Sequence, residues 1–266
     1  MIVCKSPAEI ERMRAANLLV ADVLMELRGR VAPGVTTGAL DAFAEGLVRQ
    51  AGAVPAFKGY HGFPATLCIS VNEEVIHGIP GPRAVCEGDI VSIDLGVVLD
   101  GFYGDAAITV PAGAVTAEAA ELMRVTEESL YLGIEQATVG ARVSDIGYAV
   151  QRHVEAHGFS VVREFVGHGV GRALHEEPQV PNYGPAGRGP RLTEGMTLAI
   201  EPMVAMGKAA VKVLGDGWTA VTKDRSLAAH FEHTIAITAA GPVILTRSGR
   251  ASRAGMPGRS GHVSGG

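Results

Sequence analysis

The sequence lacks the features that mark a secreted or membrane-bound protein. Its cysteines, Cys4, Cys68 and Cys86, are odd in number, scattered and without a Cys-x-x-Cys pair, which argues against a disulfide framework or a thiolate zinc site. The amino-terminal residues have no apolar signal-peptide core, and no apolar run is long enough to cross a bilayer. We therefore expect a cytoplasmic protein without a membrane partner.

An excess of positive charge is also missing. The 266 residues carry a formal net charge of −5, which gives no reason to expect a specific nucleic-acid partner. Hydrophobic residues make up 47% of the chain, and the length suits one catalytic domain, expected at residues 1–248. Residues 249–266 are rich in Gly, Ser and Arg and predict a disordered tail. The alternative is a basic arm that makes a transient contact with the ribosome.

The order of the predicted helices and strands is repeated along the chain. A capping box, Ser6-Pro7-Ala8-Glu9, starts a helix over about 7–30. A second helix is predicted over 37–51, followed by strands at 66–71, 89–98 and 102–110. The second half begins with a helix over 117–136 and another that Ser144 caps and Gly158 ends. Strands are then predicted at 159–165, 196–206, 211–214, 218–222, 231–238 and 243–246. This recurrence indicates an internal duplication with a site between the two halves.

Five side chains able to bind metals interrupt apolar, strand-like segments: Asp94, Asp105, His168, Glu201 and Glu232. A carboxylate inside such a segment is costly unless something compensates its charge. Four carboxylates and one imidazole at one spot would repel one another unless cations lay between them. Four oxygen donors and one nitrogen, with no thiolate, suit a pair of divalent ions such as Co, Mn, Fe or Zn. The pattern therefore predicts a two-metal hydrolase.

Two of these carboxylates belong to one predicted hairpin. Asp100-Gly101 between two strand-like runs is a strong signal for a two-residue turn. With that turn, Asp105 lies opposite Gly96, and Asp94 lies opposite Ala107. The two aspartates then share a face as diagonal neighbours, about 7–8 Å apart between Cα atoms and within reach of one ion.

Taken singly, the other three candidates have ordinary structural explanations. Glu201, which precedes Pro202, and Glu232 are about as compatible with an edge-strand or surface position as with metal binding. A lone histidine such as His168 is more often a satisfied core residue than a ligand. Here a second histidine, His175, follows seven residues later.

Together these residues resemble the type I methionine aminopeptidases. The resemblance covers about residues 5–247. It rests on five segments: GYHGFPATLCISVNEEVIHGIP at 59–80, DIVSIDLGVVLDGFYGDAA at 89–107, GHGVGRALHEEPQVPNY at 167–183, LAIEPM at 198–203 and FEHTIAIT at 231–238. Type II enzymes carry a long insertion in the second half, so the short stretch between Glu201 and Glu232 favours type I.

The resemblance implies an α+β, pita-bread fold: a pseudo-twofold duplicated antiparallel sheet covered by two pairs of helices. It also implies two divalent metal ions, with Asp105 and Glu232 shared between them. Asp94 would bind one ion, and His168 with Glu201 would bind the other. The implied reaction is removal of the initiator methionine from nascent polypeptides whose second residue is small, by a metal-activated hydroxide.

Further site residues follow from the same resemblance. Glu201 would be the general base, His175 would stabilise the oxyanion, and His77 would contact the leaving-side amide nitrogen. The methionine side chain would lie in a slot lined by four side chains: Tyr60, Phe63, Cys68 and Trp218. His77 as a loop cap and Cys68 as an ordinary core residue are the competing explanations.

The chain departs from the family pattern at two positions. Phe57 stands where many bacterial members have cysteine, and Ala173-Leu174 stands where glycine-phenylalanine is common. Both changes bear on the substrate profile and not on the reaction.

Three other functions were weighed. Prolidases and aminopeptidase P carry a large domain before the catalytic one, for which the residues ahead of Asp94 leave too little room. A non-enzymatic binding protein on the same fold would have lost metal ligands, and all five are present. A nucleic-acid-binding module built on the tail would have to dominate an acidic body. We expect a monomer.

Overall fold

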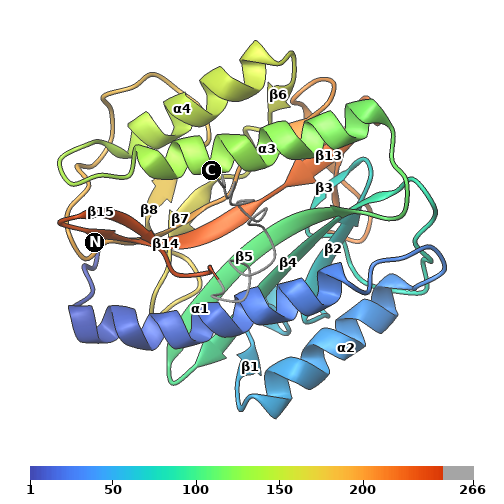
Figure 1. Ribbon diagram of the computed structural model, residues 1–266, viewed down its shortest axis with the longest axis horizontal. Coiled ribbons are helices and arrows are strands. Elements are labelled where there is room, and N and C mark those ends of the chain that lie inside the picture. The colour runs from blue at the N-terminus through green and yellow to red at the C-terminus, as the bar shows by residue number, and fades with distance from the viewer. Residues whose placement is uncertain (248–266) are drawn as a thin grey trace, which may run out of the picture.

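The structure, a computed structural model, describes residues 1–247. The predicted tail, residues 249–266, and the domain limit at residue 248 lie outside the described residues. Four α-helices form within the described part: α1 (Pro7–Arg28), α2 (Thr37–Gln50), α3 (Ala117–Glu135) and α4 (Val143–Ala156), with a short 3₁₀ helix, η1, at Tyr60–Gly62. Figure 1 shows α1 and α2 on one side of the view and α3 and α4 on the other, with strands passing between the pairs.

The helices begin where local chemistry satisfies their first backbone N–H groups. At α1 the predicted capping box is present: the Glu9 N–H donates to Ser6 Oγ at 3.3 Å, and the Ser6 N–H donates to the Glu9 carboxylate at 2.9 Å. The predicted cap of α4 was wrong. The N-cap is Arg142, two residues earlier than predicted, and the Asp145 carboxylate accepts from the Arg142 N–H at 2.7 Å. Ser144 instead accepts from the backbone N–H of Arg188.

Fifteen strands form within residues 1–247: β1 (Val54–Pro55), β2 (Leu67–Val71), β3 (Glu74–Ile76), β4 (Ile90–Leu99), β5 (Phe102–Pro111), β6 (Ser160–Val161), β7 (Gly167–Gly169), β8 (Glu176–Val180), β9 (Thr197–Ile200), β10 (Met203–Ala205), β11 (Val211–Val213), β12 (Ala220–Thr222), β13 (Ala228–His230), β14 (Glu232–Thr238) and β15 (Gly241–Ile244).

Nine of these strands form one antiparallel sheet. Its order is β1-β4-β5-β14-β9-β7-β8, with β2 also paired to β4 and β15 to β14. The pairing of β5 with β14 joins the first half of the chain to the second. Two small three-stranded sheets, β13-β10-β6 and β11-β12-β3, complete the described part.

The predicted strand over 196–206 is split in two. β9 ends at Ile200 and belongs to the large sheet, whereas β10 begins at Met203 and belongs to a small one. Pro202, which has no N–H to donate to a ladder, lies in the break next to Glu201. The strand predicted over 159–165 is also shorter, since only Ser160–Val161 pairs.

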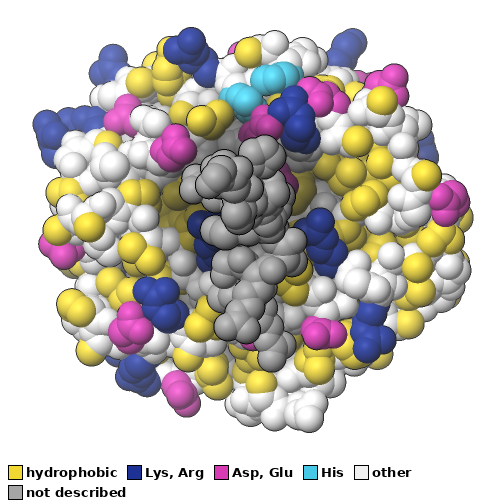
Figure 2. All heavy atoms as spheres, in the orientation of Figure 1, with side chains coloured by type: hydrophobic (Ala, Val, Ile, Leu, Met, Phe, Trp, Pro, Cys, Tyr) yellow, Lys and Arg dark blue, Asp and Glu magenta, His cyan; other side chains and the backbone are white. Residues whose placement is uncertain are grey.

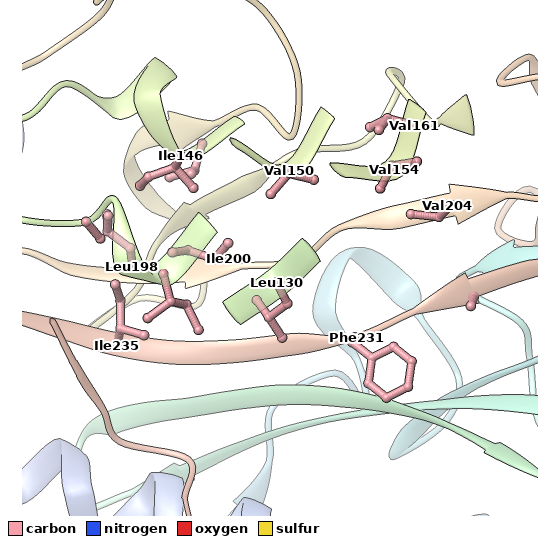
Figure 3. Close-up of a cluster of buried hydrophobic side chains, with 14 of the residues drawn as sticks. Leu130, Ile146, Val150, Val154, Val161, Leu198, Ile200, Val204, Phe231 and Ile235 are labelled. Atoms are coloured by element: carbon pink, nitrogen blue, oxygen red, sulfur yellow. The ribbon is translucent and has the colours of Figure 1, made fainter. Parts of the chain in front are cut away.

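Each helix pair covers its own apolar core. Side chains of α1 and α2, such as Val20 and Leu40, pack with the β2, β4 and β5 side chains of one cluster. Figure 3 shows the matching cluster of the second half, where Leu130 of α3 and Val150 of α4 lie over Leu198 and Ile235 of the sheet. The two clusters hold the central strands rigidly, so side chains on those strands are fixed in position.

The outer surface carries charge of both signs. Figure 2 shows Lys and Arg side chains interspersed with Asp and Glu among apolar groups on the face turned to the viewer. Among the helices of residues 1–247, none is both long and apolar enough to cross a membrane.

Candidate metal centre

The hairpin of β4 and β5 has the register predicted from its turn. Leu99 pairs with Phe102 across Asp100-Gly101, which both have positive φ, as a two-residue turn requires. Asp105 therefore lies opposite Gly96, and Asp94 lies opposite Ala107. The two carboxylates share one face of the sheet, as predicted.

Strand pairing brings Glu232 to the same face. Ala107 pairs with Asp94 on one side and with Glu232 on the other, so these three residues form one row across β4, β5 and β14. Side chains in such a row point to the same side of a sheet. Glu232 therefore lies beside the two aspartates although it comes from the opposite half of the chain.

The next strands contribute His168 and Glu201 by the same geometry. His168 of β7 pairs with Ala199 of β9, which pairs with Thr234 of β14. Thr234 is two residues from Glu232, so this second row shares its face. Glu201 follows Ala199 by two positions, just beyond the end of β9.

The side chains of the five residues converge. His168 Nε2 lies 3.5 Å from Glu201 Oε1 and 3.8 Å from Asp105 Oδ2. One ligand atom each of Asp105, His168 and Glu232 lies within 4.8 Å of the other two. The Nδ1 atom of His168 lies 2.9 Å from the carbonyl oxygen of Gly169, so Nδ1 carries the proton. The lone pair of Nε2 then faces carboxylate oxygens, an arrangement that needs a cation between them.

Burial makes this cluster electrostatically unfavourable on its own. The exposed fractions of the four carboxylate residues are small: Asp94 8%, Asp105 3%, Glu201 6% and Glu232 2%. Loss of solvation raises the pKa of Asp94 to about 8. The pKa values of Asp105, Glu201 and Glu232 are raised well above their usual range. Burial is the larger cause, and repulsion from the neighbouring carboxylates is the smaller one.

The same carboxylates have unused ligand atoms. Among the described residues, Oδ1 of Asp94, Oδ1 of Asp105 and Oε1 of Glu232 are buried without a hydrogen-bond partner. Buried oxygens in protein interiors are otherwise nearly always satisfied. Unpartnered oxygens, mutual repulsion and an oxygen-rich donor set with one imidazole all fit divalent cations.

The cluster forms one wall of a cavity of about 160 Å³. All eleven site residues predicted from the sequence line it, together with the two departures from the family pattern and one residue not predicted, Ile76. The predicted residues are Tyr60, Phe63, Cys68, His77, Asp94, Asp105, His168, His175, Glu201, Trp218 and Glu232, and the two departures are Phe57 and Leu174.

The two non-ligand histidines stand near the cluster in neutral form. The Nδ1 atom of His175 lies 2.6 Å from the hydroxyl of Tyr60, and its ring centroid lies 4.4 Å from that of His168. Burial lowers the pKa of His175, and burial lowers that of His77 to about 4. The His77 ring packs edge-on against Trp218, with 6.3 Å between centroids. Neutral imidazoles at these places are able to donate a hydrogen bond without adding charge.

The apolar end of the cavity is built from aromatic rings and a thiol. The rings of Phe63 and Trp218 meet edge to face, with centroids 5.1 Å apart. Cys68 of β2 lies directly opposite Asp94 of β4, which places its side chain on the cavity face. Burial raises the pKa of the Cys68 thiol well above its usual range, so it remains an uncharged wall residue.

One neighbour of the cluster was missed from the sequence. His230 is buried, and its Nε2 atom lies 3.7 Å from Glu201 Oε2 without a hydrogen-bond partner among the described residues. Its only signal in the sequence is its position two residues before Glu232, just ahead of the strand-like segment at 231–238.

Comparison with known proteins agrees with this geometry. The model of metallopeptidase family M24 matches residues 11–239. Methionine aminopeptidase 1 of Bacillus subtilis is 54% identical over 93% of this chain and 100% of its own length. The corresponding protein of Clostridium perfringens is 55% identical over 92% of this chain and 99% of its own.

Solved structures show the same relationship. Methionine aminopeptidase from Thermotoga maritima superposes with a TM-score of 0.92 at 49% identity, over 93% of this chain and 100% of that one. The prolidase from Pyrococcus horikoshii shares the fold, with a TM-score of 0.75 at 24% identity, but this chain spans 64% of it. These matches confirm the predicted α+β, pita-bread fold and the metal-dependent class of enzyme. The chain belongs to metallopeptidase family M24 and, within it, to the methionine aminopeptidases.

Proposed function

We propose that this chain removes the initiator methionine from nascent polypeptides whose second residue is small. The observation that carries the proposal is the single cavity in which five metal-binding side chains, two neutral histidines and an apolar slot meet. Each of these parts serves one requirement of the reaction: activation of water, stabilisation of the oxyanion and recognition of the methionine side chain.

The five ligands would hold two divalent ions, whose identity among Co, Mn, Fe and Zn is open. In this assignment Asp105 and Glu232 would serve both ions, Asp94 would hold one ion, and His168 with Glu201 would hold the other. Bound there, the ions would act as Lewis acids that activate water and polarise the scissile carbonyl. Glu201 is assigned as the acceptor of the proton released from the attacking water.

The histidines act on the two sides of the scissile bond. His175 donates a hydrogen bond to the oxygen that gains negative charge, and His77 contacts the amide nitrogen on the leaving side. Both bonds strengthen as the tetrahedral intermediate forms. Their lowered pKa values keep both rings neutral at pH 7, so neither competes with the cations for the cluster.

The slot explains selection of methionine. Tyr60, Phe63, Cys68 and Trp218 offer aromatic faces and a soft sulfur to an unbranched thioether. Rejection of a bulky second residue is steric, where the leaving-side backbone packs. The substrate places the reaction in the cytoplasm, and we expect a monomer there. The transient ribosome contact assigned to residues 249–266 lies outside the described part of the chain.

A panel of tripeptides tests the proposal. Protein reconstituted with Mn or Co is incubated with Met-Ala-Ser, Met-Ile-Ser, Leu-Ala-Ser and Ala-Pro-Ser, and the products are identified by mass spectrometry. We expect release of methionine from Met-Ala-Ser alone and loss of this activity in Asp105→Asn. The matched control is Asp100→Asn, at the exposed turn of the same hairpin, which keeps full activity.

Other outcomes identify the alternatives. Cleavage of Ala-Pro-Ser alone would assign the chain to the aminopeptidase P class. Bound metal without cleavage of any peptide would indicate a binding protein. Elemental analysis of the same sample counts the ions, and we expect two for each chain.

A further inference from the structure

A largely buried ion pair joins the amino-terminal segment to the loop that carries His175. Lys5 precedes α1, yet its side chain is only 3% exposed, and its Nζ pairs with the carboxylate of Glu176. The same Nζ donates to the Val3 carbonyl at 3.0 Å, and the backbone N–H of Lys5 donates to the Gly195 carbonyl at 2.7 Å. The lysine is therefore held inside the protein from both its backbone and its side chain.

The Glu176 carboxylate organises the loop in front of it. One oxygen accepts from the backbone N–H of Arg172 at 2.8 Å and from that of Ala173 at 3.2 Å, and the other meets Lys5. The loop closed by these bonds contains Leu174 and His175, both of which line the cavity. Rotation of the carboxylate would break its bonds to these two N–H groups or move them with it. Either change would displace the backbone of His175.

The loop rests directly on Lys5. A Cβ atom added at Gly171 would overlap the Lys5 side chain, so the loop backbone and the lysine are in close contact. Two further contacts hold the same end of the loop: the Gly171 carbonyl accepts from the Tyr103 N–H at 2.8 Å, and Arg172 pairs with Glu9 at 3.1 Å. The Arg172–Glu9 pair is exposed and contributes little, which leaves Lys5 as the buried charged anchor.

Stability alone does not account for this arrangement. A buried ion pair is often no more stabilising than apolar side chains of similar size, because both charges lose their solvation. The ion pair instead fixes the orientation of the Glu176 carboxylate, because the Nζ of Lys5 contacts it directly. That carboxylate also closes the loop that contains His175.

We propose that Lys5 is a positioning residue for His175, acting through Glu176 and the loop 171–176. This inference rests on the proposed function, because it assigns Lys5 a part in the same reaction. The ion pair holds the His175 ring where it meets the developing oxyanion, while none of the five proposed metal ligands lies in the loop that it closes.

Kinetics of Lys5→Met provide the first test, because methionine keeps an unbranched side chain of nearly the same length and removes the charge. We expect kcat on Met-Ala-Ser to fall about ten- to a hundredfold, with KM changed by less than about twofold. Glu176→Gln is the second variant, since it keeps an acceptor for the two N–H groups. The control is Arg225→Met, which breaks an exposed ion pair with Glu73 and leaves kcat unchanged. Mn²⁺ affinity, measured by calorimetry, remains that of the wild type.

A double-mutant cycle separates positioning from general damage. If Lys5 acts through His175, Lys5→Met costs nothing further once His175→Ala has removed the ring. The same loss of kcat in both backgrounds would overturn the proposal, as would a wild-type kcat in both Lys5→Met and Glu176→Gln.

The imidazole signals of Zn²⁺-loaded protein provide a readout that does not need turnover. We expect the His175 signals to shift in Lys5→Met, while those of His153 on α4 and of His157, which follows α4, stay in place. An unmoved His175 would refute the inference. Failure of the wild-type protein to release methionine would instead refute the proposed function, and the shift of His175 would still decide the role of Lys5.

Discussion

The hydroxyl of Tyr60 lies 2.6 Å from Nδ1 of His175, which links the proposed methionine slot to the residue proposed to stabilise the oxyanion. Burial raises the pKa of Tyr60 and lowers that of His175, so both groups are neutral near pH 7. We infer that Tyr60 donates to Nδ1, which leaves the imidazole proton on Nε2. A ring in this tautomer is able to donate from Nε2 to a substrate oxygen.

Tyr60→Phe removes this bond and keeps the ring in the slot. One hydrogen bond contributes about 0.5–1.5 kcal/mol, so we expect kcat on Met-Ala-Ser to fall about two- to tenfold. Tyr148→Phe, on the exposed face of α4, is the control and should behave as the wild type. Equal kcat values in the two variants would show that the Tyr60 hydroxyl does not orient His175.

The buried carboxylates predict an unusual dependence of stability on pH in protein stripped of metal by a chelator. Burial raises the pKa of Asp94 from 3.8 to about 8 in the folded state. A group with a raised folded-state pKa binds its proton more tightly in the folded protein. The free energy of unfolding therefore decreases as the pH rises from about 4 to about 8.

Asp94→Asn isolates this effect, because the buried histidines titrate alike in both proteins. We expect the metal-free wild type to lose stability relative to Asp94→Asn as the pH rises through this range, measured by urea unfolding. Added Mn²⁺ should reverse the order above pH 7, since the wild type alone keeps all five ligands. Parallel stability curves for the two metal-free proteins would contradict the assigned pKa.

His230 supplies a third prediction. Its Nε2 atom lies 3.7 Å from Glu201 Oε2, and no other partner is found for it in residues 1–247. Loss of a group that orients a metal ligand typically costs ten- to a hundredfold in metal affinity. If His230 orients Glu201, His230→Leu should therefore lower the affinity for Mn²⁺ about ten- to a hundredfold. His230→Gln, which keeps an N–H donor, should retain most of the affinity. Equal calorimetric affinities in the two variants would mean that His230 only fills space.

Local rules were enough to predict the relative placement of two of the five residues in the candidate metal centre. The turn Asp100-Gly101 sets the register of its hairpin, so the shared face of Asp94 and Asp105 follows from the sequence alone. The position of Glu232 beside these residues depends on the pairing of β5 with β14, which no local sequence pattern specifies. It was predicted from the five metal-binding side chains in apolar segments and from the resemblance to a family, and not from a strand register.

Contacts between distant segments explain what was missed. β7 has three residues, too few for a periodic pattern, and it exists because His168 pairs with Ala199 of a strand far along the chain. Lys5 and Glu176 form an ion pair in the structure, although the sequence alone predicts that both charged residues lie on the surface. Burial of a charge is decided by what folds over it, so composition and spacing give no sign of it.

Phe57, one of the expected departures from the family pattern, predicts a coupled pair of substitutions. Gly96 lies opposite Asp105, and a Cβ atom added there would lie 2.5 Å from Cε1 of the Phe57 ring. Gly96→Ala should therefore push this ring into the cavity that it lines and raise KM for Met-Ala-Ser about tenfold or more.

Phe57→Ala removes the obstacle and leaves space beside the slot. We expect Gly96→Ala to be harmless in the Phe57→Ala background, because its methyl group then fills part of that space. Steady-state kinetics of the two single variants and the double variant measure the coupling. Additive changes in KM would show that the ring of Phe57 does not limit the slot, and the substrate profile would then depend on Leu174 instead.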